Sequence, residues 1–382
     1  MSKKGFTTGS CAAAASKAAA YMLCTGNPID KIIISTPAGI DYETHIIDAT
    51  CDHNDDQGIL PDRAGCAVKK ERCDDPDVTA GMIIRADLTR IRDGRGDVTI
   101  EGGDGIGKIT KPGLDRPVGD WAINSVPRLM IEHEVRDVME EYDFGDSICV
   151  KISAPEGEKI AQKTFNPKLG IEGGISIIGT SGIIEPMSTR AIIDTIRVQL
   201  RQRKALGDTV AIISPGNYGL DFMSENFGYD SEKAVKCSNY IGDTIDIVKE
   251  LGFEGMLLVG HIGKLIKLSG GIMNTHSQEA DCRMELMAAA AARCQADFKL
   301  LSNILDSVST EEACGYVSKA GIAEECYSYI IKRIDYHLKK RAKGMPVDCI
   351  VYSTVYGVLG MTDNAEALMK TAVDSTKEVN IK

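Results

Sequence analysis

The first 150 residues combine apolar patterns of two kinds, one with the period of a helix and one with the period of a strand. Residues 11–24 are rich in alanine and are followed by Gly26, which predicts a helix that ends there. A second helix is expected over 131–142, where apolar residues recur at helical spacing. Short apolar or alternating runs predict strands over 31–36, 82–88, 97–102 and 147–154. This order predicts an N-terminal α+β domain over residues 1–150.

After about residue 170 the pattern changes, and short apolar strands alternate with helices. The expected strands cover 175–184, 210–214, 255–262 and 347–354, and the expected helices cover 188–204, 238–251 and 280–294. Alternation of this kind is typical of a doubly wound parallel sheet. We therefore expect residues 151–382 to form a Rossmann-like doubly wound α/β domain.

The net charge of the chain and the lengths of its apolar runs indicate which classes of partner and which cellular compartment are expected. The chain of 382 residues carries a net charge of −11, and nucleic acids and anionic membranes attract basic surfaces, so neither is an expected partner. No run approaches the roughly 18 apolar residues of a membrane span. We interpret the Ala-rich start as a helix of the mature protein and expect a cytoplasmic protein.

The twelve cysteines are expected to be reduced thiols, many of them buried as small apolar residues. No two of them are spaced as C-x-x-C, and Cys66 and Cys73 have no neighbouring histidine. Structural zinc sites need such spacing, so we expect no protein-bound metal.

Candidate chemistry is confined to small polar clusters beside apolar strands or at the start of helices. They are TTGS (7–10), DDPD (74–77), GTSG (179–182), GHIGK (260–264) and NTH (274–276). In an open α/β sheet, ligands bind beyond the carboxyl ends of the strands, where such turns lie. The alternative is that each cluster is only a turn or a helix cap. DDPD is expected to fix the backbone or to hold a basic side chain in place.

In this order, the clusters and their surroundings resemble the cobalt-precorrin-5B C1-methyltransferase (CbiD) family. The resemblance spans about residues 5–300, with Ala80 where His is expected and Ser125 where Pro is expected. It is carried by 5–19, 74–81, 103–114, 122–128, 164–188, 236–243 and 257–281.

The resemblance implies that S-adenosylmethionine is the co-substrate and that its methyl group is transferred to C-1 of cobalt-precorrin-5B. The product is cobalt-precorrin-6A, an intermediate of anaerobic cobalamin biosynthesis, and the cobalt belongs to the substrate. The implied partner is therefore a small molecule, and a homo-oligomer is compatible with the sequence. Because a sulfonium is a reactive methyl donor, alignment and exclusion of water supply much of the rate without a strong protein nucleophile.

For the donor we favour the turn Gly179, Thr180, Ser181 and Gly182, where small residues let the backbone approach a ligand closely. Glu185 or Asp221 is a candidate for binding the ribose hydroxyls, and Asn217 is a substitute for the acidic residue that usually ends the second strand. The alternative is a tight turn with no ligand.

For the acceptor, a macrocycle with many carboxylates, we expect dispersed donors at the start of the Ala-rich helix and a local patch of basic residues. These candidates are Thr7, Thr8, Ser10, Lys108, Lys111, Arg128, Lys264, Lys267, Asn274 and Thr275. The alternative is that TTGS caps the helix and that the basic side chains are solvated.

His261, Lys264 and His276 are the candidate catalytic residues. His261 directly follows an apolar strand, and proton handling or a hydrogen bond to a carboxylate would suit that place. Lys264 and Lys267 would share one face if 263–268 is helical. A lone histidine is more often a satisfied structural residue.

Two other functions remain open from the residues alone. A hydrolase acting on the same macrocycle would need Cys11, Thr180 or Ser181 activated by a histidine. A non-enzymatic carrier would bind the macrocycle without affinity for S-adenosylhomocysteine.

Overall fold

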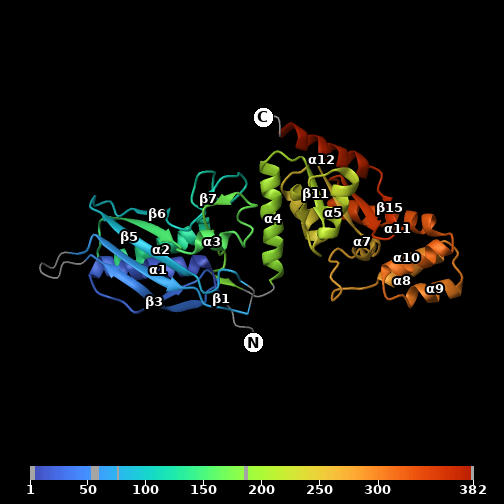
Figure 1. The fold of residues 1–382 in the computed structure, drawn as a ribbon. Coiled ribbons are helices and arrows are strands. Elements are labelled where there is room, and N and C mark those ends of the chain that lie inside the picture. The colour runs from blue at the N-terminus through green and yellow to red at the C-terminus, as the bar shows by residue number, and fades with distance from the viewer. Residues whose placement is uncertain (1–4, 53–59, 75–76, 185–187, 380–382) are drawn as a thin grey trace. The chain divides into compact units, whose positions relative to one another are not determined.

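The computed structural model describes residues 5–52, 60–74, 77–184 and 188–379, which form two compact units, Met1–Ser188 and Thr189–Lys382 (Figure 1). The predicted boundary after residue 150 is too early. Strands β9 (Ile171–Glu172) and β10 (Ile183–Ile184) pair with strands of the first unit, so the chain completes that unit before it enters the second.

The first unit is built on a six-stranded sheet. The strands have the order β2 (Lys31–Ser35), β3 (Asp41–Cys51), β4 (Arg63–Lys69), β5 (Ile83–Ile91), β8 (Ser147–Ser153) and β6 (Val98–Gly102). Neighbours are antiparallel except β6 and β8, which are parallel. A small pair is formed by β7 (Lys108–Ile109) and β9, and the short helix α3 (Gly157–Ala161) follows β8.

Helix α1 (Thr8–Thr25) forms the centre of the first unit's core. It packs against α2 (Ser125–Glu141) and against the sheet, and its alanines are fully buried. Alanine has high helix propensity and little bulk, so this helix can be covered on nearly every side without loss of close packing. Thr7 caps its start, and Gly26 ends it in the left-handed conformation that favours glycine.

The second unit is built on a five-stranded sheet. The strands have the order β12 (Val235–Lys236), β11 (Val210–Ser214), β13 (Gly255–His261), β14 (Val347–Ser353) and β15 (Gly357–Met361). The first four are parallel, and β15 is antiparallel to β14.

Helices cover both faces of this sheet, because alternate residues of its strands enter two different apolar cores. One face packs against α5 (Asn217–Phe227) and α12 (Ala365–Val379). The other packs against a larger layer, which consists of α4 (Thr189–Ala205), α6 (Ile241–Glu250), α7 (Ile262–Leu265), α8 (Arg283–Arg293), α9 (Phe298–Leu305), α10 (Thr310–Lys319) and α11 (Ala323–Ala342). Within the described ranges no helix is both long and apolar enough to cross a membrane.

The predicted strand over 175–184 is largely wrong. Only Ile183–Ile184 form a strand, β10, which pairs antiparallel with β1 (Gly5–Phe6) in the first unit. Ile175 and Ile177 make isolated parallel bridges to Ile106 and Ile123. The apolar run is therefore buried against the first unit and does not begin the parallel sheet.

Candidate functional site

Polar residues gather at the carboxyl edge of the second unit's sheet. Because β11, β13 and β14 are parallel, their last residues Ser214, His261 and Ser353 lie at the same edge. His261 is in register with Tyr352 of β14. Open α/β sheets bind ligands at this edge, so the side chains that converge on it form the candidate site.

Glu311 joins two of these strand ends. It lies in the first turn of α10, where its Oε1 is 2.7 Å from His261 Nε2 and accepts hydrogen bonds from the backbone N–H and hydroxyl of Thr354 at 3.1 and 3.2 Å. Its Oε2 accepts from the Ser353 hydroxyl at 2.6 Å. Burial acts to raise the pKa of Glu311, but the hydrogen bonds from Ser353 and His261 outweigh it and hold that pKa below its usual range.

Both ring nitrogens of His261 are engaged. Nδ1 accepts a hydrogen bond from the backbone N–H of Gly263 at 3.0 Å and so caps α7. This contact assigns the neutral ring's proton to Nε2, which donates it to Glu311. A proton-transfer role for His261 would require the bond to Glu311 to open, whereas a positioning role uses the geometry as it stands.

Tyr352 adds a buried hydroxyl to this edge. Its ring stacks on Phe222 with centroids 4.3 Å apart and meets the His261 ring edge-on at 5.6 Å. The hydroxyl oxygen is buried and has no hydrogen-bond partner among the described residues. Burial raises the pKa of Tyr352 to about 12, so the phenol stays neutral and can donate a hydrogen bond.

Lys264, which ends the GHIGK segment, and Lys267 have different surroundings, and the helix over 263–268 on which a shared face depends is only partly α-helical. Residues Ile262–Leu265 are α-helical and Ile266–Gly270 form a tighter 3-10 turn. Lys264 is half-buried, and burial lowers its pKa. Lys267 is only 2% exposed, and its ammonium donates to the carbonyl oxygens of Thr275 and Ala280 at 3.1 and 2.8 Å.

Lys267 thereby fixes the NTH segment. The buried Thr275 also donates its backbone N–H to the carbonyl of Asn239 at 2.9 Å, and Asn274 forms a bridge with Tyr240. The NTH segment thus lies against both the turn around Lys267 and the loop that follows β12. His276 is exposed, and its Nδ1 accepts from the backbone N–H of Gln278.

Asn217 is the first residue of α5, the helix that follows β11 after two intervening residues. Its side chain is exposed, as is that of Asp221 one turn further along the helix. The preceding N-cap residue is Gly216, which has no side chain to occupy the first N–H groups of the helix. Among the predicted donor residues, Asn217 and Asp221 therefore lie on the helix that begins at the sheet's carboxyl edge, and Glu185 lies outside the described residues.

The predicted donor turn Gly179–Gly182 lies in the first unit, against the start of α1. The Ser10 hydroxyl donates to the Gly182 carbonyl at 2.6 Å, and the backbone N–H of Thr7 donates to the same oxygen at 3.1 Å. Thr180 is exposed and Ser181 is half-buried. This turn therefore belongs to the first unit and not to the Rossmann-like domain expected over residues 151–382.

Thr7, Thr8 and Ser10 are buried, with exposures of 8, 4 and 0%. The Thr7 hydroxyl oxygen accepts from the N–H of Ser10, and that of Thr8 accepts from the N–H of Ile178 at 2.9 Å. These hydroxyls cap α1 and bind the 178–182 backbone, which favours the structural alternative for this cluster.

The basic residues of the first unit that are candidates for binding the substrate differ in exposure and in their existing contacts. Lys108 and Lys111 are exposed, and the Lys108 ammonium lies 4.6 Å from the centroid of the Trp121 ring. Arg128 is half-buried and donates to the carbonyls of Ile123 and Ile100, both at 3.0 Å. Burial lowers the pKa of Arg128.

Asp77, the last residue of the DDPD segment, holds a buried lysine, which is one of the two roles expected for this segment. Lys70 is 2% exposed and forms an ion pair with Asp77. Burial acts to raise the pKa of Asp77, but the hydrogen bonds from Lys70 and Thr79 outweigh it and lower that pKa.

Sequence reasoning missed Glu311 and Tyr352. A signal for Glu311 exists, because Ser309 and Glu312 have the spacing of a capping box. The Ser309 hydroxyl accepts from the N–H of Glu312, and the Glu312 carboxylate accepts from the N–H of Val308, one residue before the N-cap. That signature places Glu311 in the first turn of a helix. Nothing local indicates that the helix meets the end of β14.

We expect Gly182→Ala to destabilise the first unit by about 2–4 kcal/mol, because Gly182 has φ +79° and an added Cβ would lie 2.7 Å from Thr36 Cβ. Gly173→Ala is the matched control, since Gly173 has φ +81° with nothing within 4 Å. Urea unfolding should show the larger loss for Gly182→Ala. Equal losses of stability in the two variants would mean that the positive φ, and not the contact with Thr36, causes the effect at Gly182.

The fold and this edge define an α/β protein that carries its polar cluster where parallel sheets bind small molecules. Among the described residues, no group of three or more His, Cys, Asp and Glu side chains is placed to hold a metal ion. The chain belongs to the CbiD family: the family's sequence profile, described as CbiD, matches residues 1–186, and that of the CbiD C-terminal domain matches 274–363.

Relatives in two bacteria are named cobalt-precorrin-5B C(1)-methyltransferase. The protein of Ruminiclostridium cellulolyticum is 46% identical over 340 residues, which cover 89% of this chain and 86% of that protein. The protein of Thermoanaerobacter sp. is 44% identical over 327 residues, which cover 86% of each chain. A crystal structure of the cobalamin biosynthesis protein CbiD from Archaeoglobus fulgidus is 26% identical, covers 73% of this chain and 84% of that chain, and has a TM-score of 0.39.

Proposed function

We propose that this chain is a cobalt-precorrin-5B C(1)-methyltransferase. The main support is the 46% identity across 89% of the chain with a relative of that name. Functional loops of an α/β protein vary more readily than its core, so similarity over nearly the whole chain includes the regions that form a site. The reaction joins a methyl carbon to ring carbon C-1, breaks the sulfur–methyl bond of the donor, and leaves S-adenosylhomocysteine.

We place the donor at the carboxyl edge of the second unit, which we interpret as a Rossmann-like doubly wound domain. The order β12-β11-β13-β14 reverses direction between β11 and β13, and the crevice at such a reversal is a common ligand site. The turn after β11 fits a polar ligand, because Gly216 leaves the first N–H groups of α5 available and Asn217 and Asp221 are exposed. When bound, S-adenosylmethionine supplies an electrophilic methyl group.

The chain's own residues would position the two reactants and shield them from water. Glu311 fixes His261 and the end of β14, which sets the shape of the edge. The half-buried Lys264 offers a cation to a substrate carboxylate, and partial burial strengthens such a charge-assisted bond. Alignment of two reactants in a site that excludes water supplies much of the rate in a reaction of this kind.

The deciding experiment incubates the full-length protein with S-adenosylmethionine and cobalt-precorrin-5B under anaerobic conditions. The expected product has gained one methyl group, and one S-adenosylhomocysteine forms for each product molecule. A product that has gained water would identify a hydrolase. Binding of the macrocycle with no turnover and no affinity for S-adenosylhomocysteine would identify a carrier.

We expect Lys264→Ala to weaken macrocycle binding about tenfold or more through loss of a charge-assisted hydrogen bond, while affinity for S-adenosylhomocysteine stays unchanged. Calorimetric titration measures both affinities, and Lys299→Ala, at an exposed lysine of the same unit, is the control. Added salt should weaken the wild type more than the variant. Loss of the donor with retention of the macrocycle would show that the two sites are assigned the wrong way round.

A further inference from the structure

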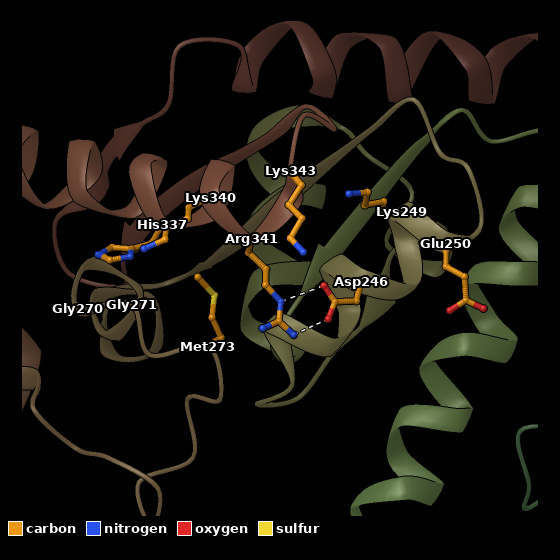
Figure 2. Close-up of a pocket in the computed structure, with 10 residues that line it drawn as sticks. All are labelled: Asp246, Lys249, Glu250, Gly270, Gly271, Met273, His337, Lys340, Arg341 and Lys343. Atoms are coloured by element: carbon orange, nitrogen blue, oxygen red, sulfur yellow. Dashed lines mark hydrogen bonds and ion pairs between the residues drawn. The ribbon is translucent and has the colours of Figure 1, made fainter.

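The second unit contains an open pocket of about 970 Å³, and none of the candidate site residues described above lines it. It is lined by the end of α6, by the turn around Gly270 and Gly271, and by the end of α11 (Figure 2). Met273 contributes an apolar side chain, and most of the other lining side chains are charged.

Two acidic groups of this pocket are already neutralised. Asp246 forms a two-pronged ion pair with Arg341, in which Arg341 Nε lies 3.0 Å from Asp246 Oδ1. Glu250 pairs with Arg197 at 2.6 Å. Because both carboxylates are paired with arginines, they do not neutralise the positive charge of the neighbouring lysines.

Three lysines remain without a carboxylate partner among the residues that the structure describes: Lys249, Lys340 and Lys343. All three are exposed. The amines of Lys249 and Lys343 come from different elements and point into the space above the Arg341–Asp246 pair (Figure 2). In a chain of net charge −11, such a concentration of positive charge in one hollow is a local exception.

We propose that this pocket binds a small organic anion that carries several carboxylate or phosphate groups. Separate ammonium groups around one hollow match several separate anionic groups better than a single charge. Met273 and the two glycines offer apolar surface and close backbone approach to the organic part of the ligand. This site is additional to the methyl-transfer site.

A purely structural role for these lysines makes a different prediction. Lys249 and Lys340 lie in the last turns of α6 and α11, where a cation offsets the negative end of the helix dipole. If that were their whole role, replacing them would lower stability, and the wild-type protein would show no affinity for polyanions.

The test uses calorimetric titration of the full-length protein with benzenehexacarboxylate and, separately, with inorganic triphosphate. The variant Lys340→Ala/Lys343→Ala should bind about tenfold more weakly or worse. The control Lys319→Ala/Lys332→Ala removes the same charge from exposed positions of this unit outside the pocket and should match the wild type. Urea unfolding of each variant checks that the fold is retained.

The outcomes separate the two ligand classes and can overturn the proposal. Binding of the hexacarboxylate alone would identify a polycarboxylate site, and binding of triphosphate alone would identify a polyphosphate site. Absence of binding to either probe in the wild type would overturn the proposal. So would equal losses in the pocket variant and the control, because they would reflect net charge and not this pocket.

Discussion

Replacing Glu311 by glutamine should lower the rate of methyl transfer by about 100-fold, equivalent to about 2.7 kcal/mol in the activation barrier. Glu311 accepts hydrogen bonds from His261, Ser353 and Thr354. A glutamine of the same shape turns an NH2 group toward one of these donors, so the network cannot close. Steady-state kinetics with the proposed substrates measures the effect. Glu324→Gln, in the first turn of α11, is the control and should retain the wild-type rate.

The same substitution has a pH signature that a merely steric effect would lack. The pKa of Glu311 is lower in the folded protein than its ordinary value of 4.5. Its contribution to stability is therefore present above pH 4.5 and is lost as the pH falls through the lowered pKa. The difference in free energy of unfolding between wild type and Glu311→Gln should be constant near neutral pH and shrink in acid. A difference independent of pH would rule out this role for the carboxylate.

Replacing Lys267 by methionine should lower the free energy of unfolding of the second unit by about 2–4 kcal/mol. Methionine fills a similar volume but leaves the carbonyls of Thr275 and Ala280 without their buried donor. Relief of the cost of burying a charge offsets part of this loss. The NTH segment would also lose its anchor, so we expect methyl transfer to fall as well.

Urea unfolding measures the stability effect, and Lys299→Met, at an exposed position in the same unit, is the control. Limited proteolysis reports on the segment directly, because release of 275–280 exposes new backbone to cleavage. Unchanged unfolding and unchanged cleavage in Lys267→Met would show that the two carbonyls find other partners.

Local signals in the sequence identify the elements that are stabilised locally. The Ala-rich helix, the β-branched run at 31–36 and the apolar runs at 255–262 and 347–354 all correspond to observed elements whose ends lie within a few residues. Each has a strong propensity or a cap that acts within a few residues. The strand prediction for 175–184 is wrong because the apolar residues of this segment are buried by partners up to about 180 positions away in sequence.

The candidate site likewise contains some features that local sequence predicts and others that it does not. The GHIGK and NTH clusters could be recognised as polar turns, and both lie beside the second sheet. The inward orientation of Lys267 depends on how the loop that contains Thr275 and Ala280 folds back over it, and the meeting of Glu311 with Ser353 depends on packing between α10 and the end of β14. No spacing rule within one segment contains that information.

The pairing of β1 with β10 also determines when the first unit can form during synthesis. Gly5–Phe6 need Ile183–Ile184, and the start of α1 is hydrogen-bonded to residues 178–182, so these contacts close a loop of nearly the whole unit. Such long-range closure slows folding. The Ala-rich helix must therefore leave the ribosome long before its last partners are made. We expect nascent chains that stop before residue 178 to expose this helix and to be bound by chaperones until translation passes Ile184.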